Sequence, residues 1–90
     1  MSGSDVRSIR ITETGSLGIG PARIRQIQVQ TTIGSPRLTI TDGSGGAVAL
    51  DMDLGASVTH SVNIPSDGIR VSDIWVSNLT AITSVTVFYS

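Results

Sequence analysis

The chain has 90 residues with no cysteine, no lysine and one histidine, and its charged residues give a formal net charge of −1. This is the length of one domain, so we expect a single domain over residues 1–90. The charge balance excludes the basic excess of a nucleic-acid binder or a membrane anchor. The missing cysteines exclude a disulfide framework and a thiolate zinc site. No apolar run reaches the roughly 18 residues of a spanning helix.

Composition favours an all-β fold. Ile, Val and Thr together make up a third of the chain, and β-branched residues suit a pleated, half-buried surface. Good helix formers are scarce, and no window carries an apolar stripe of helical period. The first residues, 1–5, are small and polar and predict a flexible N-terminal arm.

Alternation of apolar and polar residues predicts seven or eight short strands. In chain order the expected strands are residues 6–12, 22–32, 38–41, 48–54, 58–64, 69–72, 73–79 and 85–89. The segments 69–72 and 73–79 fit two short strands or one bent strand. The last segment is apolar on both faces, which is typical of a strand in the middle of a sheet.

The segments between these strands carry turn chemistry. Residues 13–21 read as a long connection, 65–68 as a tight turn and 79–84 as a further turn. The Gly-rich segment 42–46 separates two alternating runs and predicts a hairpin. Within 22–32 the apolar parity changes after Ile24, which predicts a β-bulge near Arg25 and Gln26. Together these features predict a small antiparallel β-sandwich, jelly-roll or another Greek key, or else a small barrel.

Several large aliphatic residues fall in the expected connections. Such residues cover one end of a core or contact a neighbouring chain, and the sequence leaves both open. The residues are Leu17, Ile19, Ile33, Leu79 and Ile82.

Arginine is the only cationic side chain apart from the histidine, and it favours fixed pairs with carboxylates. Arg7 and Arg10 fall on the first expected strand, and Arg23 and Arg25 on the second. Pairing within the chain and pairing between subunits both fit. We take these four arginines, with Leu17 and Ile19, as candidate interface residues.

Candidates for chemistry are few, and we expect no catalytic residue, no cofactor and no enzyme activity. His60 shares a face with apolar neighbours and has no nucleophile motif, so we expect it to be a packed side chain with one satisfied nitrogen. Asp42, Asp51 and Asp53 fall on or beside one hairpin, where carboxylates suit calcium, although a solvated strand face is the simpler interpretation. Trp75 is the single tryptophan; a core or interface position is favoured over stacking on a sugar.

The strand and turn segments together resemble small β-rich virion proteins encoded by tailed bacteriophages. The resemblance is carried by VRSIRI at 6–11, ARIRQI at 22–27, LTITDGSGG at 38–46, IPSDGI at 64–69 and SVTVFY at 84–89. It implies a non-enzymatic component of the virion, a capsid decoration (cement) protein on the capsid surface. Proteins of this kind often form trimers and brace joints between major capsid subunits, so the implied partners are copies of itself and the major capsid protein.

Alternatives remain open at this point. A tail, fibre or adaptor subunit of the virion would share the same sequence pattern. A small glycan-binding β-sandwich would use Trp75 for stacking and Asp42, Asp51 and Asp53 for calcium. In the decoration hypothesis, residues 1–12 form an arm that becomes ordered on assembly, with Arg7 and Arg10 as pairing residues.

Overall fold

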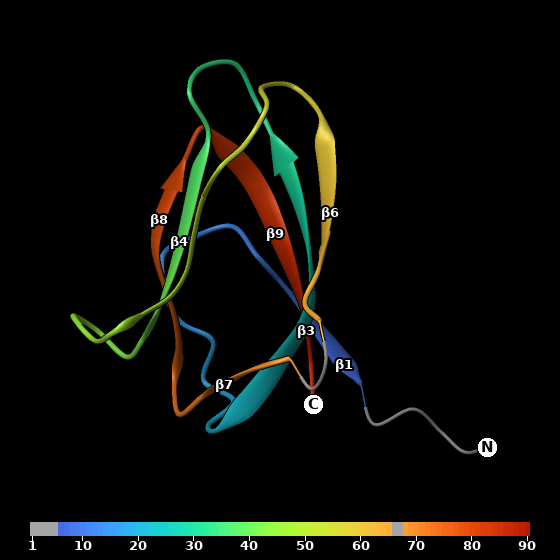
Figure 1. Cartoon of the computed structure of the whole chain (residues 1–90). Helices are drawn as coiled ribbons and strands as arrows, with labels where there is room; N and C mark the ends of the chain where they lie inside the picture. Colours follow the sequence, from blue (N-terminus) through green and yellow to red (C-terminus); the bar gives the residue numbers. More distant parts are fainter. Residues whose placement is uncertain (1–5, 66–67) are drawn as a thin grey trace.

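The computed structural model describes residues 6–65 and 68–90, which form nine β-strands and no helix (Figure 1). The strands are β1 (Arg7–Ile11), β2 (Gly15–Ser16), β3 (Ala22–Thr31), β4 (Arg37–Asp42), β5 (Val48–Asp53), β6 (Thr59–Asn63), β7 (Ile69–Val71), β8 (Ile74–Thr80) and β9 (Ile82–Tyr89). Eight of them lie at the predicted segments. The ninth, β2, is two residues long and falls inside the predicted connection 13–21.

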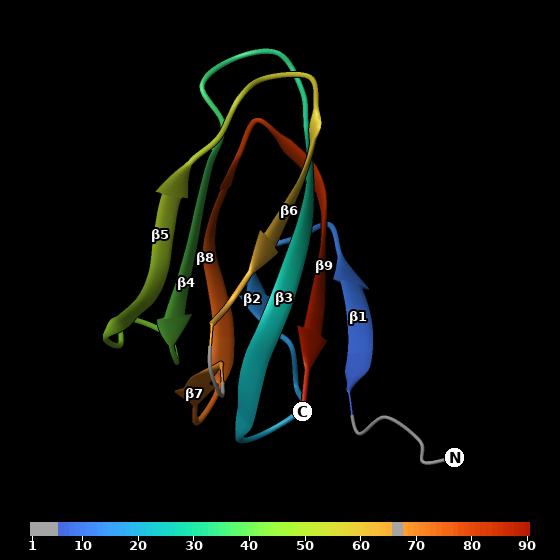
Figure 2. The same ribbon diagram turned by 45° about the vertical axis from the view of Figure 1, so that its right-hand side comes forward.

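The strands form two antiparallel sheets. Sheet A has the order β1-β9-β3-β6, with β7 also paired to β3, and sheet B has the order β2-β8-β4-β5. The four long strands of sheet A lie side by side in Figure 2, with β9 and β3 in the middle. The last strand is therefore central in its sheet, as its two apolar faces predicted.

The pairings are nested like one long hairpin. Strand β4 pairs with β5, β3 with β6, β2 with β8 and β1 with β9. This hairpin is rolled up, so that β9 also pairs with β3 and β8 with β4. The resulting order is that of a jelly roll, in which two Greek keys share two packed sheets. The strand order therefore identifies the sandwich as a jelly roll, a choice that the spacing of turns in the sequence left open.

The core between the sheets is aliphatic. One face of each sheet is apolar because side chains alternate along a strand, and the two apolar faces pack together. The largest fully buried side chains are Ile24, Ile27, Val29, Leu38, Ile40, Val71, Ile74, Val76, Val85 and Val87. Four of the five aliphatic residues in the expected connections, Leu17, Ile19, Leu79 and Ile82, belong to this core or pack against it.

The predicted bulge in β3 is confirmed. Ile24 lies opposite Tyr89 and Gln26 opposite Phe88, so Arg25 is the extra residue of the bulged strand. The bulge keeps Ile27 in the core although Ile24 is also buried. As a consequence the glutamines that follow it face away from the core.

The hairpin predicted around 42–46 is confirmed as β4–β5. The backbone N–H of Asp42 donates to the carbonyl of Ala47 over 2.9 Å. Gly43 has a φ of 80°, which glycine adopts without strain. A side chain at Gly46 would put its Cβ 1.8 Å from the carbonyl oxygen of Asp42. The turn thus depends on glycine at two of its positions.

Other predictions need correction. The turn expected over 79–84 is confined to Ala81, which has a φ of 53° between β8 and β9. Residues 7–11 do not form an arm that becomes ordered only on assembly, because β1 pairs with β9 within one copy of the chain. Residues 1–5, the predicted flexible arm, lie outside the described residues. In the turn at 65–68, the N–H of Gly68 donates to Pro65, and residues 66–67 lie outside the description too.

Candidate functional surfaces

One end of the sandwich exposes large aliphatic side chains. The side chain of Ile33, between β3 and β4, is 85% exposed, and that of Val58, between β5 and β6, is 47% exposed. Both loops lie at the upper end of Figures 1 and 2. We call Ile33 and Val58 the apolar tip. Of the five aliphatic residues in the expected connections, Ile33 is therefore the one that does not pack in or against the core.

The loops at this end are held together by Thr31. Its hydroxyl lies 2.7 Å from the carbonyl oxygen of Gly55 and 3.0 Å from that of Val58, and it accepts from the N–H of Val58 over 3.1 Å. The backbone N–H of Thr31 also donates to Val58, and that of Ser57 donates to Thr32. The apolar tip is therefore presented on a hydrogen-bonded support. Sequence reasoning did not single out Thr31, because a threonine at a strand end carries no distinctive signal.

The candidate interface residues are spread over different surfaces. Arg7 and Arg10 are exposed on the edge strand β1. Leu17 is buried and Ile19 packs against the core, so both side chains contact the interior of a single copy of the chain. The structure does not bring the four arginines and these two aliphatics into one patch, and a role for them between subunits stays a prediction.

Two of these arginines lie near the C-terminal end of the chain. Arg25 donates from its Nε to the hydroxyl of Ser90 over 2.8 Å. Arg23 lies opposite Arg70 in the register of β3 and β7. Arg23 and Arg70, but not Arg25, line a shallow hollow of about 180 Å³ together with Pro21, Ala22 and Ser90.

Two of the three aspartates considered for calcium, Asp42 and Asp51, accept hydrogen bonds from different partners, and Asp53 lies opposite Arg37 in the register of β4 and β5. The Oδ1 atom of Asp42 accepts the backbone N–H groups of Ser72 and Asp73, each over 3.1 Å, and so fixes the connection from β7 to β8. Asp51 forms a bidentate ion pair with Arg37, with distances of 3.0 and 2.8 Å, and also accepts from Thr39. The described residues contain no group of three potential metal ligands. Asp42 and Asp51 thus act as structural acceptors.

The ion pair on sheet B predicts a pH dependence. Hydrogen bonds from Arg37 and then Thr39 lower the pKa of Asp51 from 3.8 to about 2. Because the pKa of Asp51 is lower in the folded chain, the ionised carboxylate stabilises the fold at pH values above its ordinary pKa. This contribution is lost as the pH falls from about 4 towards 2. Asp51→Asn should remove this part of the acid sensitivity, measured by urea unfolding between these pH values. The effect should be small because the pair is exposed.

Asp53→Asn is the matched control, since Asp53 lies on the same exposed face of β5. The control variant should lose stability at low pH to the same extent as the unmodified chain. An Asp51→Asn profile identical to that of the unmodified chain would contradict the assignment.

His60 has a structural role. The N–H of Gly55 donates to its Nε2 atom over 3.1 Å, so the ring closes the loop between β5 and β6. This is the packed histidine with a satisfied nitrogen that the sequence predicted.

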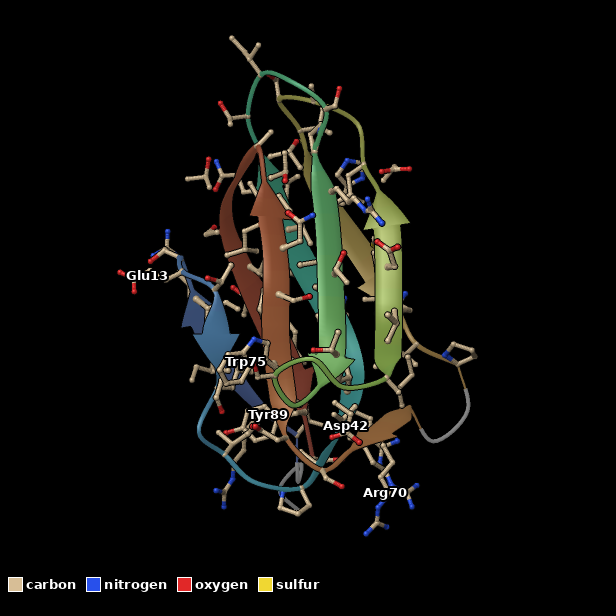
Figure 3. All side chains as sticks on the ribbon, turned by 90° about the vertical axis from the view of Figure 1, so that its left-hand side faces the viewer. Glu13, Asp42, Arg70, Trp75 and Tyr89 are labelled. Atoms are coloured by element: carbon tan, nitrogen blue, oxygen red, sulfur yellow. The ribbon has the colours of Figure 1, made fainter. Side chains whose placement is uncertain are left out.

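Trp75 is not a core residue. It is half-buried on the outer face of sheet B, opposite Ser16 on one side and Thr41 on the other (Figure 3). The other two aromatic residues, Phe88 and Tyr89, are on β9 of sheet A. No aromatic platform therefore forms around Trp75, and an interface position for it stays a prediction.

No protein-family model matches the chain, and neither a curated protein nor a solved structure is significantly similar to it. The part of the chain that the structure describes holds no helix long and apolar enough to cross a membrane.

Proposed function

We propose that this chain is a non-enzymatic structural subunit that binds a protein shell as a homo-oligomer, of the kind that decorates bacteriophage capsids. The observation that carries the proposal is the apolar tip, with Ile33 85% exposed on a loop that is hydrogen-bonded to its neighbours. Large aliphatic side chains on exposed, hydrogen-bonded loops are typical of contacts between proteins, because burying them removes apolar surface from water at a reduced ordering cost.

The fold and the sequence resemblance support the same class. Jelly rolls recur in viral capsid proteins, although they also recur in lectins, so this support is an analogy at the level of fold. The mean hydropathy of +0.24 is high for a small monomeric protein.

The mechanism is multivalent binding. Each copy makes a weak contact with the shell, and joined copies engage several shell subunits at once, which raises the overall affinity without a new contact. We assign the apolar tip to the contact between copies, which leaves the two sheet faces free for other partners.

The test is the mass of the purified full chain by light scattering over a range of concentrations. We expect a closed oligomer, a trimer in the simplest case, and dissociation to monomers in the double variant Ile33→Ser with Val58→Ser. Val48→Ser is the matched control, because Val48 is 62% exposed but lies at the start of β5, outside the tip. The control should remain oligomeric.

A chain that is monomeric at every concentration would contradict the homo-oligomer. An oligomer that survives the tip substitutions would contradict the role of the tip. The oligomer should then sediment with purified bacteriophage capsids, and failure to do so with the capsid of its own virion would contradict shell binding.

A further inference from the structure

The outer face of sheet A is a regular array of polar side chains. The register places Arg10, Thr86, Gln28 and Ser61 in one row across β1, β9, β3 and β6. The neighbouring rows hold Ser8, Phe88, Gln26 and Asn63 on one side and Ser84, Gln30 and Thr59 on the other. None of the side chains in these rows is a carboxylate, and Phe88 is the only apolar one.

This array is hollowed between the row of Gln28 and the row of Gln30. A depression of about 170 Å³ has as its polar lining Arg10, Gln28, Gln30, Thr59, Ser84 and Thr86. Ser84 is 7% exposed and forms a low point between exposed neighbours. The lining comes from four strands of one sheet, so the backbone hydrogen bonds hold the groups at fixed spacing.

Gln28 and Gln30 line the hollow, and Gln26 lies one row beyond them on the same face. Gln26, Gln28 and Gln30 project on one face at intervals of two residues, about 7 Å apart. Each amide both donates and accepts, which suits the adjacent hydroxyl groups of a sugar ring. Hydroxyls of Thr59 and Thr86 add further donors and acceptors. Phe88, in the next row, offers an aromatic surface for the apolar face of a second sugar.

Arg10 adds a positive charge to the hollow. Its side chain is exposed, and within residues 6–65 and 68–90 it makes no ion pair or hydrogen bond from its guanidinium group. A guanidinium group binds carboxylate or sulfate groups through two parallel hydrogen bonds. The three rows contain no carboxylate that would compete for this guanidinium group, so a ligand with an anionic group is favoured here.

From this arrangement we infer that the hollow on sheet A binds an acidic oligosaccharide, whose hydroxyls pair with the glutamines and whose anionic group pairs with Arg10. The site lies on the opposite sheet from Trp75. It does not depend on the oligomer or on shell binding, since the four strands of one copy supply it.

The test is a titration of the full chain, labelled with ¹⁵N, followed by the side-chain amide signals of the three glutamines. The probes are oligogalacturonate for carboxylate, a heparin-derived oligosaccharide for sulfate, and a malto-oligosaccharide of the same length as the neutral comparison. We expect the signals of Gln28 and Gln30 to shift with at least one acidic probe. Which probe binds more tightly identifies the anionic group. The neutral probe should bind more weakly.

Two substitutions test the residues of the site. Arg10→Gln should weaken binding about tenfold to a hundredfold, as expected for the loss of a charge-assisted hydrogen bond. Gln28→Ala should weaken it by about threefold to tenfold, as for a neutral hydrogen bond. Arg70→Gln is the matched control, because it removes the same charge from the other hollow and should leave binding unchanged.

Three results would overturn the inference. The glutamine signals could remain unshifted with every probe. Binding could be lost in Arg70→Gln and kept in Arg10→Gln, which would place the anion at the other hollow. The neutral probe could bind as tightly as the acidic ones, which would leave Arg10 without a role. None of these results changes the mass of the oligomer, so the two proposals fail separately.

Discussion

Replacing Ile27 with alanine is expected to destabilise the fold by about 2–5 kcal/mol, the usual cost of truncating a buried isoleucine. Ile27 is fully buried and lies on β3, which pairs with β6, β7 and β9. Its loss leaves a cavity between the sheets that the neighbouring β-branched side chains fill poorly. The measurement is the free energy of unfolding by urea or guanidinium denaturation.

Ile33→Ala is the matched control, because it makes the same chemical change at a side chain that is 85% exposed. At concentrations where the chain is monomeric, this variant should change stability by no more than about 0.5 kcal/mol, as exposed substitutions generally do. Equal costs at both positions would contradict the assignment of Ile27 to the core and Ile33 to the tip.

Replacing Thr31 with valine is expected to cost about 1–3 kcal/mol, because two hydrogen bonds of a buried side chain are lost and each contributes roughly 0.5–1.5 kcal/mol. Valine keeps the shape of the side chain and removes its hydroxyl. The carbonyl of Gly55 and the N–H of Val58 then lose their side-chain partner. The loop between β5 and β6 should also loosen, which faster amide hydrogen exchange at residues 55–58 would reveal.

Thr83→Val serves as the control, since Thr83 is exposed on β9 and its hydroxyl has no hydrogen-bond partner among the described residues. This variant should be close to neutral in stability and in exchange. If Thr31→Val were equally neutral, the hydroxyl would not hold the two loops together. In that case the rigidity of the apolar tip would need another source.

The candidate surfaces could be predicted from the sequence only in part. Ile33 was among five aliphatic residues in expected connections, but the choice between core and surface depends on which loops meet at the end of the sandwich. Arg10 was singled out as a cation, whereas the hollow beside it was not found. That hollow needs Gln28 from β3, Ser84 from β9 and Thr59 from β6, and these residues are far apart along the chain.

The carboxylates that were considered for calcium show the same limit. Asp42, Asp51 and Asp53 are close in sequence, which suggested a shared ion. In the structure Asp42 accepts from the β7–β8 connection and Asp51 from Arg37 across β4 and β5. Hydrogen-bond partners from other segments decided what Asp42 and Asp51 do.

By itself, the sequence determined the all-β class, the position of eight strands, the hairpin at 42–46 and the bulge after Ile24. These features are local, because the alternation of apolar side chains and the turn preferences of glycine and proline act within a few residues. Only the tertiary structure decided the jelly-roll order, the burial of Leu17, the exposure of Ile33 and the grouping of Arg10 with the glutamines of β3. These features arise from pairings between distant segments, such as β1 with β9 and β9 with β3, and no local pattern encodes which strands become neighbours.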